Sequence, residues 1–274
     1  MFLFRTRSGI FLRESDSWWS LPSSDWDDLF NAADLTAQLQ RAQQAAPVAA
    51  PDAGDLLAPI GTQEVWAAGV TYYRSRTARM EESKDAGGGS FYDRVYEAER
   101  PEIFFKATPQ RTVGPGGLMH LRRDSRWMVP EPEFTLAINA AGQIIGCTVG
   151  NDLSCRDIEG ENPLYLPQAK CFKNCAALGP ALWITPIPLA ADTAIECRIE
   201  REGNEVFHGE TTLAQLKRKP TELAEFLYRD NTFPTGAYLM TGTGIVPPDD
   251  FTLHPGDLIH ITLAGLGTLS NSVA

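Results

Sequence analysis

The stretch that decides the fold runs from Glu131 to Asp152 and reads Glu131-Pro-Glu-Phe-Thr-Leu-Ala-Ile-Asn-Ala-Ala-Gly-Gln-Ile-Ile-Gly-Cys-Thr-Val-Gly-Asn-Asp152. Two apolar runs lie on either side of Ala141-Gly142, which is typical of two strands joined by a tight turn. With the turn at this position, Glu131 pairs with Asp152 and Glu133 pairs with Gly150. The sequence therefore predicts an antiparallel hairpin with its acidic residues at the open end.

Three carboxylates converge at that end of the predicted hairpin. Side chains alternate along a strand, so Glu131 and Glu133 share one face, across from Asp152. Opposed Cβ atoms lie ~5 Å apart, where two bare charges repel by roughly 3 kcal/mol at an effective dielectric of about 20. A hard cation would offset this repulsion, and three carboxylates suit Mg²⁺, with Mn²⁺ or Ca²⁺ as substitutes. The alternative is a solvent-facing acidic strand edge, and Pro132 favours an edge or a bulge at that point.

The rest of the chain predicts a small N-terminal domain before a larger, strand-rich one. Residues 1–22 have the pattern of short strands, a helix is expected from Asp25 to about Ala46, and a Pro/Ala-rich linker follows. We place the boundary between residues 1–59 and 60–274. In the second part a polar helix is expected from Tyr72 to about Ser83, then a Gly-rich loop at 87–90 and a helix after Pro220. The remaining segments that predict strands are VWAAGV, IFFKA, AIECRIE, EVFHGE, AYLMTG and DLIHITL.

Composition excludes several classes of partner. The 274 residues carry a formal net charge of -11, which repels phosphate backbones and anionic lipids, so neither nucleic acid nor membrane is an expected partner. Arg5 and Arg7 interrupt the first apolar residues before a secretory segment can form. The five cysteines form no CxxC pair, which favours reduced thiols. These features predict a cytoplasmic enzyme.

Other polar residues are candidates for chemistry beside the carboxylates. Lys170 in LPQAK and Glu102 in ERPEIFFK could each transfer a proton, the alternatives being a surface lysine and a strand-edge acid. Arg74 could meet a substrate carboxylate, or lie on a solvated helix face. The segment TGTG at 241–244 offers backbone amides and the Thr243 hydroxyl as an anion cradle.

Three motifs in this order resemble the fumarylacetoacetate hydrolase superfamily over roughly residues 60 to 274. They are the ExE of Glu131 and Glu133, the segment NDLSCRDIEGENPLYLPQAK at 151–170, and TGTG at 241–244. The resemblance implies an α+β chain with a mixed β-roll catalytic domain beside the small N-terminal α/β domain. It also implies Mg²⁺ held by the three carboxylates, a 2-oxo acid substrate, and assembly as a homodimer or homotetramer.

Two departures from the family pattern argue against carbon–carbon bond hydrolysis as the reaction of this chain. Hydrolases of this family often carry GxNYxxHxxE, but the matching segment GVTYYRSRT, which begins at Gly69, lacks its His and Glu. A Gln often found after the Arg-Asp of the second motif is Glu159 here. The segments GVTYYRSR, ERPEIFFKA and SCRDIEGENPLYLPQAK are most similar to the 2-keto-3-deoxy-D-arabinonate dehydratase branch.

That branch implies a dehydratase that makes 2,5-dioxopentanoate, with Lys170 and Glu102 as the catalytic pair. Glu159, Arg74 and Thr243 are then expected to contact the substrate. The alternatives are an acylpyruvate or diketo-acid hydrolase, an oxaloacetate-type decarboxylase, and a non-catalytic protein that binds a metal or a sugar acid.

Overall fold

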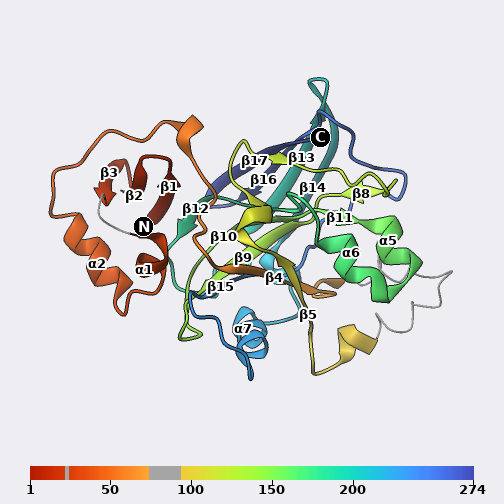
Figure 1. The fold of residues 1–274 in the computed structure, drawn as a ribbon, viewed down its shortest axis with the longest axis horizontal. Helices are drawn as coiled ribbons and strands as arrows, with labels where there is room; N and C mark the ends of the chain where they lie inside the picture. Colours follow the sequence, from red (N-terminus) through yellow and green to blue (C-terminus); the bar gives the residue numbers. More distant parts are fainter. Residues whose placement is uncertain (22–24, 74–93) are drawn as a thin grey trace.

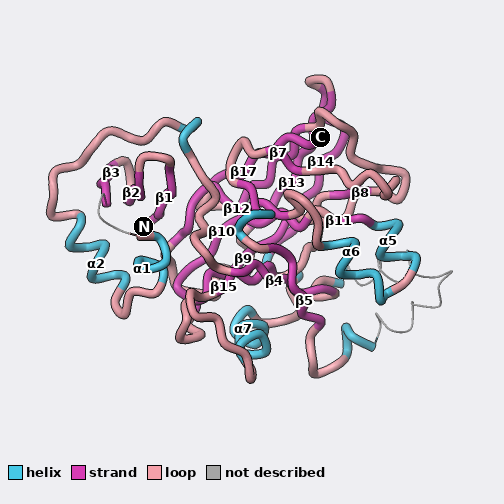
Figure 2. The backbone as a smooth tube through the Cα atoms, viewed as in Figure 1, coloured by secondary structure: helices cyan, strands magenta, loops and turns pink. Residues whose placement is uncertain are grey.

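The chain folds mainly as β structure (Figure 1). This computed structural model describes residues 1–21, 25–73 and 94–274. Within these residues the strands form sheets of ten, five and two strands, and the helices are short and peripheral (Figure 2). Among the described helices, none is long and apolar enough to cross a bilayer. The expected helix from Tyr72 to about Ser83, apart from its first two residues, and the loop at 87–90 lie outside the described residues.

The N-terminal residues form three strands and two helices that lie together on one side of the molecule (Figure 1). The elements are β1 (Phe2–Thr6), β2 (Gly9–Glu14), β3 (Ser17–Leu21), α1 (Trp26–Phe30) and α2 (Leu35–Ala42). The strands agree with the sequence prediction, but the single helix from Asp25 to about Ala46 is wrong. Asp25 and Asp34 each accept hydrogen bonds from N–H groups of a first helical turn. A second N-cap within the segment therefore divides it into two helices.

Strand β1 joins this part to the large sheet. It pairs antiparallel with β12 (Ala176–Trp183), with Phe2 opposite Trp183. The order of the sheet is β3-β2-β1-β12, then β10 (Ile144–Asp152), β9 (Pro132–Ile138), β15 (Ala237–Met240), β4 (Glu64–Gly69) and β5 (Glu102–Ala107). The tenth strand, β6 (Thr112–Val113), lies off this path and pairs parallel with β12. One cluster of buried side chains continues through both parts. The division of the chain into domains of residues 1–59 and 60–274 stays a prediction. The pairing of β1 with β12 crosses that boundary, so one sheet contains strands from both parts.

The predicted hairpin is at the centre of this sheet. Strands β9 (Pro132–Ile138) and β10 (Ile144–Asp152) pair antiparallel, with Glu133 opposite Gly150 as predicted. The Asp152 N–H donates to the Glu131 carbonyl oxygen at 3.0 Å, so the register holds up to the open end. The register shifts by one residue near the turn, at a bulge between Ile144 and Gly146.

Three more strands converge on the same end of the sheet. They are β15 (Ala237–Met240), β4 (Glu64–Gly69) and β5 (Glu102–Ala107). β15 runs parallel to β4 and antiparallel to β9, so it ends close to the place where β9 begins. β5 is antiparallel to β4 and begins where Gly69 pairs with Glu102. The start of β9 and the ends of β10, β15 and β4 therefore surround one point.

A second sheet packs against β9, β10 and β12. Its order is β14 (Asn204–Thr212), β13 (Ala194–Arg201), β16 (Leu258–Leu263), β17 (Gly267–Val273) and β7 (Leu118–Met119). Smaller strands are β6 (Thr112–Val113), β8 (Met128–Val129) and β11 (Ser154–Cys155). Later in the chain lie the α-helices α5 (Arg156–Glu161), α6 (Leu166–Lys170) and α7 (Pro220–Tyr228). The helix expected after Pro220 is α7, with its proline in the first turn.

Two glycines allow a test of the packing that sets β15 in place. Gly236 precedes β15 with φ of +83°, and a Cβ there would lie 2.5 Å from the Ile138 carbonyl oxygen and 2.7 Å from the Phe30 ring. Gly256 has φ of +92° but no atom within 4 Å of the same Cβ position. Gly256→Ala should lower the free energy of unfolding by about 1–2 kcal/mol, and Gly236→Ala by that amount plus about 1–3 kcal/mol for crowding. Denaturant titration of both variants measures the difference, and equal losses would contradict this account of the packing.

Candidate metal centre and active site

The three predicted carboxylates meet where the strands converge. One carboxylate oxygen from each of Glu131, Glu133 and Asp152 lies within 4.8 Å of the others. Their residues are only 5%, 2% and 0% exposed. The alternative of a solvent-facing acidic edge is therefore wrong, because water does not reach these groups freely.

The surroundings of Glu133 disfavour its charged form. Burial, followed by the charges of Asp152 and Glu131, raises its pKa well above the ordinary value. The Gly242 N–H donates to Glu133 Oε2 at 2.5 Å. Gly242 has φ of +93°, and a Cβ there would lie 2.0 Å from Thr71 Oγ1, so the backbone can approach the carboxylate only with glycine at this position.

Lys170 lies inside the carboxylate cluster. It is the last residue of α6 and is fully buried, which excludes the alternative of a surface lysine. Its Nζ donates to Glu131 Oε2 and to Ser154 Oγ, each at 2.6 Å, and lies 3.3 Å from Asp152 Oδ2. The structure therefore places a cationic, proton-carrying group in direct contact with two of the three carboxylates.

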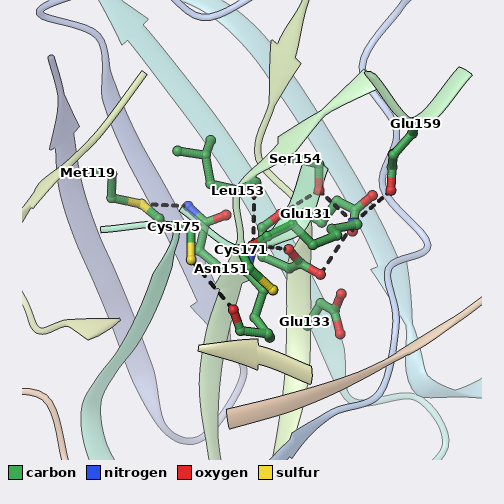
Figure 3. A network of polar contacts seen from close by, with 12 residues as sticks. Met119, Glu131, Glu133, Asn151, Leu153, Ser154, Glu159, Cys171 and Cys175 are labelled. Carbon is green, nitrogen blue, oxygen red and sulfur yellow. Dashed lines mark hydrogen bonds and ion pairs between the residues drawn. The ribbon is translucent and has the colours of Figure 1, made fainter. Parts of the chain in front are cut away.

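Four charged side chains form a closed ring of alternating sign. Figure 3 labels its two acidic members, Glu131 and Glu159. Glu131 contacts Arg156 through Oε1 at 2.7 Å and Lys170 through Oε2 at 2.6 Å. Glu159 likewise contacts Arg156 through Oε2 at 3.3 Å and Lys170 through Oε1 at 3.4 Å. Sequence reasoning did not single out Arg156, since nothing in its local pattern distinguishes it from an arginine on a helix surface.

A second lysine, Lys106 of β5, was also missed. Its Nζ lies 2.5 Å from Asp152 Oδ1, and it is fully buried. Burial is the largest single influence on Lys106 and lowers its pKa, but the charges of Asp152 and Cys175 and the hydrogen bond to Asp152 together outweigh it, so the net pKa is raised above its ordinary value. The available signal was a lone lysine within the otherwise apolar run Ile-Phe-Phe-Lys-Ala.

The other predicted residues lie around this cluster. Thr243 is buried and lines a small cavity together with Phe104 and four of the charged side chains, those of Glu131, Glu133, Arg156 and Lys170. Glu102 pairs with Gly69 across β4 and β5, and a Cβ on that glycine would lie 2.2 Å from Glu102 Oε2. Glu102 and Glu159 line a second cavity of about 470 Å³. Arg74 lies outside the described residues.

The donor set fits a hard divalent cation. Among the described residues, the cluster contains the acidic Glu131, Glu133, Asp152 and Glu159 and the basic Lys106, Arg156 and Lys170. With all seven ionised, as when a cation is bound, these side chains carry one net negative charge. The triad itself offers only carboxylate oxygens, which Mg²⁺ prefers over the nitrogen and sulfur ligands typical of zinc. Glu131, Glu133 and Asp152 are therefore the residues that could hold Mg²⁺.

Comparisons with known proteins agree with this geometry. A family model described as fumarylacetoacetate (FAA) hydrolase C-terminal matches residues 64–274. A probable 2-keto-3-deoxyxylonate dehydratase of Haloferax volcanii is 48% identical over 217 residues, which cover 78% of this chain and 73% of the relative. A 2-dehydro-3-deoxy-D-arabinonate dehydratase of Saccharolobus solfataricus is 42% identical over 219 residues, again covering 78% and 73%.

A solved structure is similar along the whole chain. It is a 2-keto-3-deoxy-D-arabinonate dehydratase complexed with magnesium and 2,5-dioxopentanoate, with a TM-score of 0.84 and 34% identity, covering 100% of this chain and 98% of that one. The predicted family, its mixed β-roll fold and the hydro-lyase class are confirmed by these similarities. The chain belongs to the fumarylacetoacetate hydrolase family.

Proposed function

We propose that this chain is a Mg²⁺-dependent dehydratase that converts 2-keto-3-deoxy-D-arabinonate into 2,5-dioxopentanoate and water in sugar-acid breakdown. The observation that carries the proposal is the position of Lys170, whose Nζ lies 2.6 Å from Glu131 beside three clustered carboxylates. The names of the relatives from Haloferax volcanii and Saccharolobus solfataricus support the substrate class. Magnesium and 2,5-dioxopentanoate in the similar structure support the cofactor and the product.

The two relatives' names are compatible with one substrate. In the D series, arabinonate and xylonate differ only at C2 and C3. The 2-keto-3-deoxy acid has a carbonyl at C2 and a methylene at C3, so both centres are lost and the same compound results. A site of this kind would therefore distinguish sugar acids by the configuration at C4 and by the length of the carbon chain.

Bound Mg²⁺ would act as a Lewis acid toward the C1 carboxylate and C2 carbonyl of the substrate, which makes the C3 proton more acidic. In our proposal, one of Lys170 and Glu102 removes the C3 proton and the other protonates the departing C4 hydroxyl, which leaves as water. The resulting C3–C4 double bond then shifts by tautomerisation to give the C5 aldehyde. Glu102 lines the cavity of about 470 Å³ together with Glu159, and Glu159 is 3.4 Å from Lys170, which lines the smaller cavity at the triad.

Several further assignments belong to the proposal. Thr243, which lines the cavity at the triad, and Glu159 are assigned to substrate contacts, as is Arg74. Mn²⁺ and Ca²⁺ are proposed as substitutes for Mg²⁺. We also propose a cytoplasmic location and assembly as a homodimer or homotetramer.

Turnover of 2-keto-3-deoxy-D-arabinonate is the direct test. We expect product only with Mg²⁺ present and none after EDTA, measured by coupling 2,5-dioxopentanoate to a semialdehyde dehydrogenase. Restoring excess Mg²⁺ after EDTA is the control for damage to the coupling enzyme. Release of pyruvate from an acylpyruvate, or of carbon dioxide from oxaloacetate, with no dehydration would replace this function by a hydrolase or a decarboxylase.

Glu133→Gln tests the metal site. The amide oxygen can still accept the Gly242 N–H, but one ligand charge is lost, so we expect Mg²⁺ affinity in calorimetry to fall by about 100-fold. The melting temperature without Mg²⁺ should not fall, because a buried and repelled charge has been removed. Glu196→Gln, which changes a half-exposed acid paired with His208, is the matched control and should bind Mg²⁺ normally. Wild-type Mg²⁺ affinity in Glu133→Gln would exclude this residue as a ligand.

Two variants test the catalytic pair. Lys170→Met and Glu102→Gln should each lower kcat by about 100-fold or more, since each removes one proton-transfer group. Both should still show heat of Mg²⁺ binding, because the three carboxylates are intact. Lys173→Met, three residues further on at an exposed position, is the control and should keep full turnover. Near-normal rates in either test variant would remove that residue from the mechanism.

A further inference from the structure

The proposed reaction leaves the buried ammonium group of Lys106 without a role. An ammonium group has three N–H donors. Its Nζ donates to the Leu153 carbonyl oxygen at 2.9 Å and to the Lys170 carbonyl oxygen at 2.7 Å, and it forms an ion pair with Asp152 Oδ1 at 2.5 Å. Three acceptors therefore surround this group, and it also lies 5.5 Å from the centre of the Phe172 ring.

These acceptors belong to the two segments that carry the proposed chemistry. Asp152 and Leu153 are at the end of β10, where the third carboxylate of the triad lies. The Lys170 carbonyl is at the end of α6. Lys106 thus connects β5 to the backbone of the proposed catalytic lysine and to the side chain of a proposed metal ligand.

The two lysines contact opposite oxygens of Asp152. Lys106 contacts Oδ1 at 2.5 Å, and Lys170 is 3.3 Å from Oδ2. A carboxylate held by one oxygen cannot turn freely to bind a cation through both. Its second oxygen remains on the side of Lys170, which also contacts Glu131 of the triad.

We propose that Lys106 is a positioning residue. By holding Asp152 Oδ1 it limits this carboxylate to one metal-binding oxygen, and by holding the Lys170 carbonyl it sets the distance between the proposed proton-transfer group and the triad. A single-oxygen ligand leaves more of the cation's coordination positions to a chelating 2-oxo acid. This inference rests on the proposed function and names a residue that serves it without contacting the substrate.

The proposal predicts that metal binding and turnover respond differently to loss of Lys106. Lys106→Met removes a positive charge from beside the triad and frees Asp152 Oδ1, so Mg²⁺ should bind as tightly as in the wild type or more tightly. Turnover should nevertheless fall by about 10- to 100-fold, as is usual when an outer partner of a metal ligand is removed. A role in folding alone would weaken both together.

Arg201→Met is the matched control. Arg201 contacts both oxygens of the buried Asp257 at 2.8 Å in the second sheet, so its loss also leaves a buried aspartate without its cation. Both variants should melt at a lower temperature in EDTA. Saturating Mg²⁺ should restore most of the melting temperature that Lys106→Met loses relative to the wild type, since a bound cation replaces the missing charge. In Arg201→Met the difference in melting temperature from the wild type should be the same with Mg²⁺ as in EDTA.

The experiment combines Mg²⁺ calorimetry, melting curves with and without Mg²⁺, and kcat for each variant. Wild-type turnover in Lys106→Met would overturn the proposal, as would a loss of Mg²⁺ affinity in proportion to the loss of turnover. If that variant does not fold, Lys106→Arg keeps the charge, but its planar guanidinium cannot reproduce the compact three-way contact. It should keep Mg²⁺ affinity and lose about tenfold in turnover, and full turnover there would show that charge alone suffices.

Calorimetry and melting need no substrate, so they separate this inference from the proposed function. If wild-type protein binds Mg²⁺ but does not dehydrate the sugar acid, the proposed function fails. The melting temperature that Mg²⁺ restores in Lys106→Met, compared with that in Arg201→Met, would still decide whether Lys106 positions Asp152.

Discussion

Repulsion among buried carboxylates is the constraint on which the rest of the site depends. Glu131, Glu133 and Asp152 bring ligand oxygens within 4.8 Å of one another where little water can screen them. Two unit charges 4 Å apart interact by about 4 kcal/mol at an effective dielectric of about 20. Such a cluster persists only when cations lie against it, and three basic side chains in the described part of the chain do so.

The direction of the strands makes this arrangement possible. β9 begins where β10, β15 and β4 end, so residues distant in sequence meet at one end of the sheet. The two short helices that follow β10 then carry Arg156 and Lys170 back toward the carboxylates. The central strands form the rigid base for this arrangement, because both of their faces are buried.

The three basic side chains contact the acidic residues of the site in different ways. Arg156 and Lys170 alternate with two glutamates in a ring, so each glutamate keeps a fixed orientation. Lys106 lies outside this ring and contacts backbone carbonyls as well as Asp152. A buried charge with three acceptors is more suited to holding neighbours in place than to exchanging protons with a substrate.

The sequence by itself determined the hairpin, its register at the acidic end and the meeting of the three carboxylates, because strand period and turn position are local properties. It also led to the family, because three motifs occur in order. Local pattern was not enough at Asp34, whose capping interaction divides the expected helix. Only the tertiary structure decided that Lys170 is buried, that Arg156 and Glu159 close a ring, and that Lys106 meets Asp152. These partners come from separate elements, and contact between them depends on how the chain packs, which no spacing along the sequence specifies.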